Sequence, residues 1–377
     1  MDESLKHYFQ KGFSYKKILL FLSKYHNTEL SMRTLQQRLH DMGLKRRNVS
    51  YDIQEVRREI IENLSGPRCS GGYRSHWHTL RLKGIQVPRR VVEELCRELD
   101  PAGCQERKAH RLKRREYRNP GPNFAWHTDG YDKLKPYGFP IHGCIDGFSR
   151  RVMWLKVSRT NNDPAVIAGF YLEAVEMEGG CPVILRTDTG TENTVIAAIQ
   201  SYFRCDGQDE HAGTKAHVYG SSHSNQRIEC WWSSFRKSRS NWWINFFKDM
   251  VDRGKLSTSN VLQMGCLWFS FSGVIQKELS EVCEHWNSHY IRKSRHDTVA
   301  GKPDELYYLP ECVNAEDQLQ SVGNDKFQDM FQYCHDYQEQ DLYQDYFKTI
   351  SSLGQFGEPN NWQEALDLYR QLLVLAI

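Results

Sequence analysis

A short apolar segment that ends on an acidic residue constrains this chain more than any other part of its sequence. Val183, Ile184 and Leu185 form an apolar run that predicts a buried strand, and Asp188 follows it after two residues. The chain then continues Thr-Gly-Thr-Glu-Asn, which indicates a glycine turn before the next helix. We therefore expect Asp188 at the C-terminal edge of a strand, facing solvent.

Two further acidic residues stand in comparable settings. Asp129 closes the segment Phe124-Ala125-Trp126-His127-Thr128-Asp129, and Glu229 lies in a segment that predicts a helix. The chain contains 47 Asp and Glu residues, so three acidic residues alone are no evidence of a metal site. The evidence has to come from the local sequence around each of them. Carboxylates that converge from two strands and a helix would form a hard-oxygen site suited to Mg²⁺ or Mn²⁺.

The sequences around these residues resemble the motifs of one superfamily. Trp126-His127-Thr128-Asp129 fits its phrase W-x-x-D, and Thr187-Asp188-Thr189-Gly190-Thr191-Glu192-Asn193 stands in place of S-D-x-G-x-E-F. Asn225-Gln226-Arg227-Ile228-Glu229 keeps the Asn of N-G-x-x-E but lacks its Gly, and Asp146-Gly147-Phe148-Ser149-Arg150 matches D-x-F-S-R. The chain thus resembles the DDE integrases and transposases, over roughly residues 120–310.

The spacing agrees with that resemblance, since 58 residues separate Asp129 from Asp188 and 40 separate Asp188 from Glu229. The resemblance implies an α/β fold class, with an RNase H-like catalytic core built on a mixed five-stranded sheet with flanking helices. It also implies that Asp129, Asp188 and Glu229 are catalytic and hold two Mg²⁺ or Mn²⁺ ions per active site. The implied activity is DNA strand cleavage and strand transfer.

Other residues of the core have predicted roles as well. Asn225, Arg236 and Lys237 are expected to hold the DNA backbone beside the metal ions, because Asn225 and Arg236 would share the helix face of Glu229. Asp146 is interpreted as a structural turn residue. Glu192 is interpreted as a charge at a helix start, stabilised by the helix dipole, and the alternative is a group that supports the metal ligands.

Two other functions stay open at this stage. The chain could instead be a transposase-derived protein that binds specific DNA sequences and no longer cuts; an intact acidic triad argues against decay of the site but does not by itself establish cleavage. A plain RNase H-like nuclease would share the core but would leave the N-terminal region without a role.

Residues 1–50 predict a helix-turn-helix DNA-binding unit. Ser14 and Ser31 are plausible N-caps of two helices, and the second helix carries Arg33 and Gln37, the expected DNA contacts. The alternative is a helical hairpin on which the same side chains are merely solvated.

Residues 51–105 predict a second helix-turn-helix-like unit. Gly84 is expected to end one helix, and Pro88 to open the next, which carries Arg89 and Arg90 as base or phosphate contacts. The segment resembles a phrase that precedes the core in bacterial insertion-sequence transposases.

Residues 106–122 form a basic linker. Its most basic part predicts contact with DNA phosphates, and the residues expected to make this contact are Arg111, Lys113, Arg114 and Arg115. A solvated helix face is the simpler interpretation.

The predicted core spans residues 123–310, and an acidic helical C-terminal tail spans 311–377. Within the core, residues 124–128, 142–145 and 152–157 predict a three-stranded meander, 181–187 a fourth strand, 207–224 a mobile loop and 224–243 one long helix. The aromatic residues of the tail are expected either to cover a partner or to pack on the chain's own core.

Charge is distributed unevenly along the chain. The tail carries −9, and the whole chain carries +3, which leaves +12 on residues 1–310. The positive charge of residues 1–310 suggests a polyanionic partner. The resemblance implies that this partner is double-stranded DNA and that the protein binds it as a homo-oligomer.

The 11 cysteines show no C-x-x-C motif, so we expect free thiols and no structural zinc. No membrane association or secretion is expected. The predicted location is the nucleus if the host is a eukaryote, and otherwise the cytoplasm or nucleoid.

Overall fold

The computed structural model of the protein describes residues 1–46, 50–106, 119–220, 225–293, 299–331, 334 and 341–376. The chain separates into two compact units. Unit 1 comprises Met1–Arg118, Arg236–Trp242 and His285–Asn314, and unit 2 comprises Asn119–Phe235, Trp243–Glu284 and Ala315–Ile377. The predicted five-part division of the chain stays a prediction. Arg111, Lys113, Arg114 and Arg115 lie outside the described residues.

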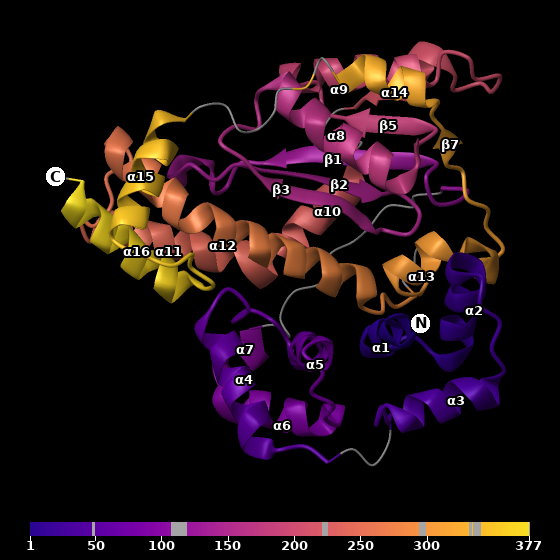
Figure 1. The fold of residues 1–377 in the computed structure, drawn as a ribbon, viewed down its shortest axis with the longest axis horizontal. Helices are drawn as coiled ribbons and strands as arrows, with labels where there is room; N and C mark the ends of the chain where they lie inside the picture. Colours follow the sequence, from indigo (N-terminus) through magenta and orange to yellow (C-terminus); the bar gives the residue numbers. More distant parts are fainter. Residues whose placement is uncertain are drawn as a thin grey trace. The chain divides into compact units, whose positions relative to one another are not determined.

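Unit 2 is built on a five-stranded sheet with the strand order β3-β2-β1-β5-β6 (Figure 1). The strands are β1 (Ala125–Tyr131), β2 (Ile141–Asp146), β3 (Val152–Val157), β5 (Ile184–Thr187) and β6 (His217–Tyr219). The first three strands form the predicted antiparallel meander, whereas β5 runs parallel to both β1 and β6. This mixed sheet with flanking helices confirms the predicted fold class.

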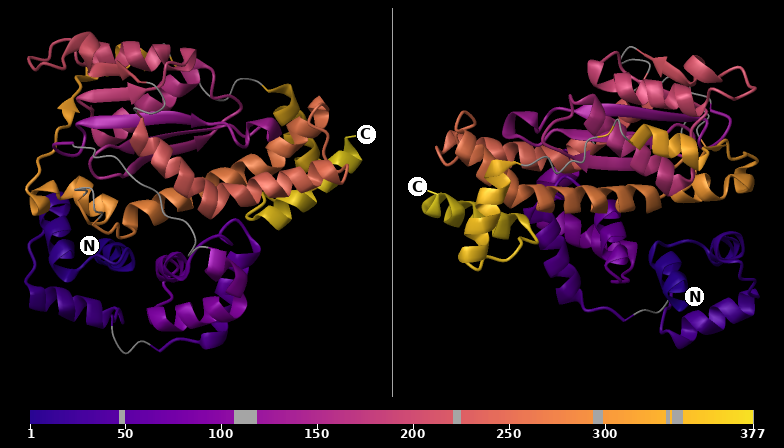
Figure 2. Two further views of the ribbon diagram at one scale, coloured as in Figure 1. Left: turned by 180° about the vertical axis from the view of Figure 1, so that it is seen from behind. Right: turned by 45° about the horizontal axis from the view of Figure 1, so that its top comes forward.

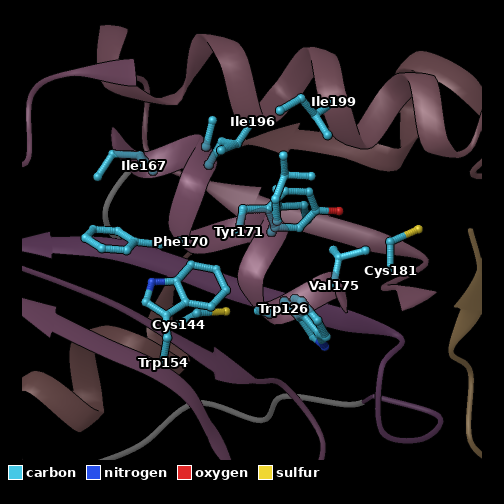
Figure 3. Close-up of a cluster of buried hydrophobic side chains, with 14 of the residues drawn as sticks. Trp126, Cys144, Trp154, Ile167, Phe170, Tyr171, Val175, Cys181, Ile196 and Ile199 are labelled. Carbon is cyan, nitrogen blue, oxygen red and sulfur yellow. The ribbon is translucent and has the colours of Figure 1, made fainter. Parts of the chain in front are cut away.

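Helices cover both faces of the sheet. One face carries α8 (Pro164–Glu178) and α9 (Thr194–Phe203), and the other carries α10 (Gln226–Phe235) (Figure 1). The core under α8 is apolar and aromatic: Trp126 of β1 lies edge-on to Trp154 of β3 and to Tyr171 of α8 (Figure 3). Nine of the 15 residues of α8 are buried, so hydrophobic burial fixes this helix on the sheet.

Three predicted elements of the core were wrong in detail. The fifth strand, β6, comes from the segment predicted as a loop. The predicted strand 181–187 is two strands, β4 (Gly180–Cys181) and β5, because Pro182 between them has no amide hydrogen to donate. The predicted single helix 224–243 is interrupted by a π-helical turn at Arg236–Ser240, after which α11 (Asn241–Asp252) begins.

The acidic tail packs on helices and strands of its own unit (Figure 1 and Figure 2). Its elements are β7 (Gln320–Ser321), α14 (Asn324–Phe331), α15 (Leu342–Leu353) and α16 (Trp362–Leu375). β7 pairs with β4, Phe327 joins the core under α8, and Phe347 is buried beside Gly265 of the long helix α12 (Val261–Ser288). Tyr343 and Tyr346 remain exposed. The aromatic residues are thus divided between the chain's own core and its surface.

Unit 1 consists of short helices around two apolar clusters. They are α1 (Asp2–Gln10), α2 (Tyr15–His26), α3 (Met32–Asp41), α4 (Ile53–Ser65), α5 (Tyr73–Leu82), α6 (Arg89–Leu99), α7 (Pro101–Glu106) and α13 (Pro303–Tyr308). The predicted caps are confirmed, because Ser14 accepts from the Lys17 amide and Ser31 from the Thr34 amide. No helix in the described part of the chain has the length and apolarity needed to cross a bilayer.

A neutral histidine inside the unit 2 core predicts sensitivity to acid. His142 is buried and accepts a hydrogen bond at Nδ1 from the Trp154 indole (3.1 Å), so a second ring proton would have to face another N–H. Burial lowers the pKa of His142 from 6.5 to about 3. Between pH 6.5 and 3, His142 is therefore protonated in the unfolded chain but not in the folded chain. The free energy of unfolding falls as the pH drops through this range.

Replacing this histidine should flatten that pH dependence. We expect His142→Gln to lower the free energy of unfolding at pH 7 by about 1–3 kcal/mol, because it loses buried contacts. Between pH 6.5 and 4 its stability should fall less steeply than that of wild type, by up to about 1.4 kcal/mol per pH unit. Urea unfolding at several pH values measures both effects, with the exposed His40→Gln as the control. Parallel curves for wild type and His142→Gln would contradict this account.

Candidate active site

Strand alternation determines which side of the sheet Asp129 faces. Trp126 of β1 belongs to the core under α8, whereas His127 contacts the residue before α10, and Tyr131 packs on rings of α10. Alternate residues of a strand share a face, so Asp129 lies on the α10 side. The Trp232 indole of α10 donates a hydrogen bond to Asp129 Oδ2 (3.1 Å), which agrees with that placement.

The Trp232 ring fits because the strand next to β1 carries a glycine. Gly143 of β2 pairs directly with Asp129 in the sheet. A Cβ atom at Gly143 would lie 2.9 Å from Trp232 Cη2 and 3.2 Å from Leu155 Cδ1, so a side chain there would displace the indole. Tyr131 covers the ring at a centroid distance of 4.9 Å. The hydrogen bond to Asp129 is therefore held by packing.

Asp188 immediately follows β5, as predicted. The Asn193 side-chain amide donates to Asp188 Oδ1 (2.6 Å) and to Glu192 Oε1 (3.1 Å), so one amide group holds both carboxylates. Burial, followed by the charge of Asp188, raises the pKa of Glu192. Glu192 thus lies beside the predicted triad, in a 3-10 turn that precedes α9.

Glu229 lies in the first turn of α10, and the start of this helix is anchored to β1 by Asn225. The Asn225 amide donates to the Thr128 carbonyl (2.8 Å), so its oxygen faces His127 Nδ1 (2.7 Å). Since that oxygen only accepts, the His127 proton lies on Nδ1. Asn225 is buried, and both ends of its amide bond to the protein. The predicted contact between Asn225 and DNA receives no support from this geometry.

The three carboxylates share one electrostatic environment. Burial raises the pKa of Asp129 to about 7, and the negative charges of Asp188 and Glu229 add to this rise, whereas the Trp232 hydrogen bond opposes it. Within the described residues, no three His, Cys, Asp or Glu side chains are grouped closely enough to hold a metal ion. The charges of Asp188 and Glu229 therefore act on Asp129, but the three carboxylates do not form a closed set of metal ligands.

Asp146 has the structural role predicted for it. It is buried and accepts hydrogen bonds from the amides of Asn123 (2.8 Å), Phe148 (3.1 Å) and Ser149 (2.7 Å), and from the Ser149 hydroxyl (2.7 Å). Burial raises its pKa to about 6, while these hydrogen bonds act in the opposite direction. Its carboxylate closes the turn between β2 and β3.

The predicted DNA contacts of unit 1 lie on exposed helix surfaces. Arg33 and Gln37 are exposed on α3, and Gln37 donates to Asp41 (2.8 Å). Arg89 and Arg90 begin α6, where Arg90 pairs with Glu94 (2.8 Å). These surfaces are open to solvent, and their contact with DNA stays a prediction.

Arg236 and Lys237 are exposed in the π-helical turn that follows α10. This turn changes the helical register after Phe235, so the face-sharing argument from regular α-helical spacing does not extend to Arg236. The Arg236 Nε donates to Asn241 Oδ1 (3.3 Å). Their role at DNA also stays a prediction.

A family model for the integrase core domain matches residues 116–319, more than half of the chain. The chain belongs to the integrase core domain family. No curated protein sequence matches it. Domains of this family are typically polynucleotidyl transferases, generally use divalent metal ions and bind DNA, and the matched residues include the whole five-stranded sheet and α10.

Sequence reasoning missed two residues that hold the site. Trp232 and Asn193 each donate to a carboxylate of the triad, yet neither was assigned a role: Asn193 only closes the motif segment around Asp188, and Trp232 lies outside the motifs. The spacing offers one signal in retrospect, because Trp232 lies three residues after Glu229 and so shares its helix face.

Two isosteric substitutions should affect stability in opposite directions. We expect Asp129→Asn to raise the free energy of unfolding of the metal-free protein by about 1 kcal/mol or more, because it removes a partly buried charge beside two others. In contrast, Asp146→Asn should lower it by about 1–3 kcal/mol, since an amide cannot accept four hydrogen bonds. Urea unfolding in EDTA measures the free energy of unfolding of both variants. A lower value for Asp129→Asn than for wild type would contradict the claim that burial and neighbouring charges destabilise the Asp129 carboxylate.

Proposed function

We propose that this protein catalyses divalent-metal-dependent cleavage of DNA strands and their transfer to target DNA. The observation that carries the proposal is the environment of Asp129, where burial and the charges of Asp188 and Glu229 together raise the carboxyl pKa to about 7. Concentrated negative charge of this kind is stabilised by a cation.

The donor set fits a hard divalent cation. Asp129, Asp188 and Glu229 offer carboxylate oxygens, which Mg²⁺ and Mn²⁺ prefer, and none of the three has a lysine or arginine ion-pair partner in the described part of the chain. When bound, such ions supply Lewis acidity, which activates an attacking oxygen and stabilises the leaving oxygen of a phosphodiester. We expect two ions held by these three residues.

The chain's own residues fix the positions of the carboxylates. Trp232 orients Asp129, Asn193 orients Asp188, and Asn225 anchors the helix that carries Glu229. Rigid positioning keeps the reacting groups in register. Attack on phosphorus by water would break the P–O3′ bond and leave a DNA 3′-hydroxyl. Attack by that hydroxyl on a second strand would form a new P–O bond and release another 3′-hydroxyl.

A second function is DNA binding without cleavage, as in a domesticated transposase. One observation favours it: the His, Cys, Asp and Glu side chains that the structure describes form no closed metal-binding group. The exposed residues of unit 1 would then carry the function, with Arg33, Gln37, Arg89 and Arg90 as contacts. For either function we propose a nuclear location in a eukaryotic host.

Loss of one carboxylate separates the two functions. Asp188→Asn should reduce metal-dependent nicking and strand transfer by at least about 100-fold, because the site loses a metal-ligating charge. It should bind duplex DNA as wild type does. Gel assays with Mg²⁺ or Mn²⁺ on candidate element ends measure both properties. The control is Asp206→Asn, at an exposed residue paired with Lys326 (2.5 Å).

The outcomes are distinct. Cleavage by wild type and Asp206→Asn, but not by Asp188→Asn, supports the catalytic proposal. Full cleavage by Asp188→Asn shows that the triad is misassigned. DNA binding by all three proteins with no cleavage by any of them identifies the non-cleaving function.

Joining two DNA ends to one target requires two active sites, so we propose a homo-oligomer on DNA. The exposed aromatic rings of Tyr343 and Tyr346 provide apolar surface for such contacts. Light scattering should show a monomer or dimer without DNA and a larger assembly with element ends. A strict monomer in both conditions that still joins two ends would contradict the oligomer.

A further inference from the structure

Three cationic side chains of unit 1 converge on the short loop between α1 and α2. Lys302 Nζ donates to the Lys11 carbonyl (2.6 Å), and an Arg46 guanidinium nitrogen donates to the Phe13 carbonyl. The Arg81 guanidinium packs against Gly12, whose backbone has φ +76°, and a Cβ atom there would lie 2.5 Å from Arg81 Cζ. Glycine at this position therefore permits both the turn and the close approach of Arg81.

A fourth cation adjoins the group through an aromatic ring. The Arg89 guanidinium lies 4.2 Å from the centroid of a Trp77 ring, and the Arg81 guanidinium lies 5.4 Å from it. The Trp77 indole donates to the Val87 carbonyl (2.7 Å), which fixes its orientation. One indole thus supports two arginines.

The donors of this cation cluster, defined as Arg46, Arg81, Arg89 and Lys302, are only partly used. Arg81 makes no hydrogen bond or ion pair to any residue that the structure describes, and Arg46 Nε is buried with no hydrogen-bond partner among them. An arginine whose role was only to cap backbone carbonyls would have its donors directed at them. The geometry of Arg81 instead leaves a planar set of donors available.

The positive charges of the cluster repel one another. Burial, then the charges of Arg46 and Arg89, lowers the pKa of Arg81 to about 10. Burial also lowers the pKa of Lys302 to about 7, with Arg81 and Arg46 adding to this and Glu305 opposing it. Of the two acids beside the cluster, Asp304 pairs with Lys11 (3.2 Å).

We propose that Arg46, Arg81, Arg89 and Lys302 form an anion site that binds a phosphate group of the DNA backbone. This proposal rests on the proposed DNA-binding function and goes beyond the exposed helix surfaces predicted from the sequence. Arginine binds phosphate through paired N–H donors, and partial burial strengthens such contacts. The site would hold unit 1 in register on DNA without reading bases.

The test uses Arg81→Gln in the full chain. Losing one phosphate contact should weaken binding to every duplex about tenfold and should reduce the slope of log affinity against log salt by about one. Because the substitution also removes a repelled charge, the free protein should melt at the same or a higher temperature. A purely structural arginine would give the opposite result, a lower melting temperature with unchanged affinity per folded molecule.

The matched control is Arg74→Gln, at an exposed arginine of the same helix that stacks on Tyr73. It removes the same charge outside the cluster and should weaken binding less than Arg81→Gln. If the two variants lost the same DNA affinity, the loss would reflect only the removal of one positive charge from the protein, and the proposed site would be overturned.

A second arm separates this site from the DNA-binding function. Inorganic phosphate should raise the melting temperature of wild type but not that of Arg81→Gln. If wild type bound no DNA while phosphate still stabilised it, a free phosphate compound would be the ligand, and the assignment to the DNA backbone would be overturned. If wild type bound DNA but phosphate and Arg81→Gln had no effect, the anion site alone would be wrong.

Discussion

Placing the Asp129 carboxylate partly out of water, beside two more carboxylates, costs free energy that the surrounding fold has to offset. Packing supplies the offset. The aromatic core under α8 holds one face of β1, the Gly143 gap admits the Trp232 ring on the other face, and that ring donates to the carboxylate. A site that is unfavourable in the free protein and favourable with a bound cation is typical of metal-dependent catalysis.

The two units carry uncompensated charge of opposite sign. In unit 2 the charges of Asp188 and Glu229 add to the raised pKa of Asp129, and in unit 1 the charges of Arg46 and Arg89 add to the lowered pKa of Arg81. Each arrangement would be stabilised by a ligand of the opposite charge, a divalent cation in unit 2 and a phosphate in unit 1. The proposed strand-transfer function needs both kinds of ligand, which would give one physical reason for the basic body of the chain.

The sequence predicted those parts of the fold that depend on local patterns. The apolar run before Asp188 became β5, and Ser14 and Ser31 became helix caps, because strand burial and capping are decided within a few residues. The fifth strand, β6, was predicted as a loop, since its three residues become a strand only by pairing with β5. A strand of that length carries almost no periodic signal.

The supporting residues of the site escaped prediction for the same reason. Asn225 was expected to face DNA, yet its amide faces two groups of β1 that lie about a hundred residues earlier in the chain. Trp232 was assigned no role from the sequence. Their partners are brought near by the tertiary fold, which motif spacing does not describe.

The measurement that most directly tests the central claim is a crystal structure of the protein grown with Mn²⁺, with the ions located by anomalous scattering. The account predicts two anomalous peaks within ligand distance of oxygens from Asp129, Asp188 and Glu229, with Trp232 still bonded to Asp129. Ordered Mn²⁺ elsewhere in the protein, with no ion touching these three residues, would contradict it.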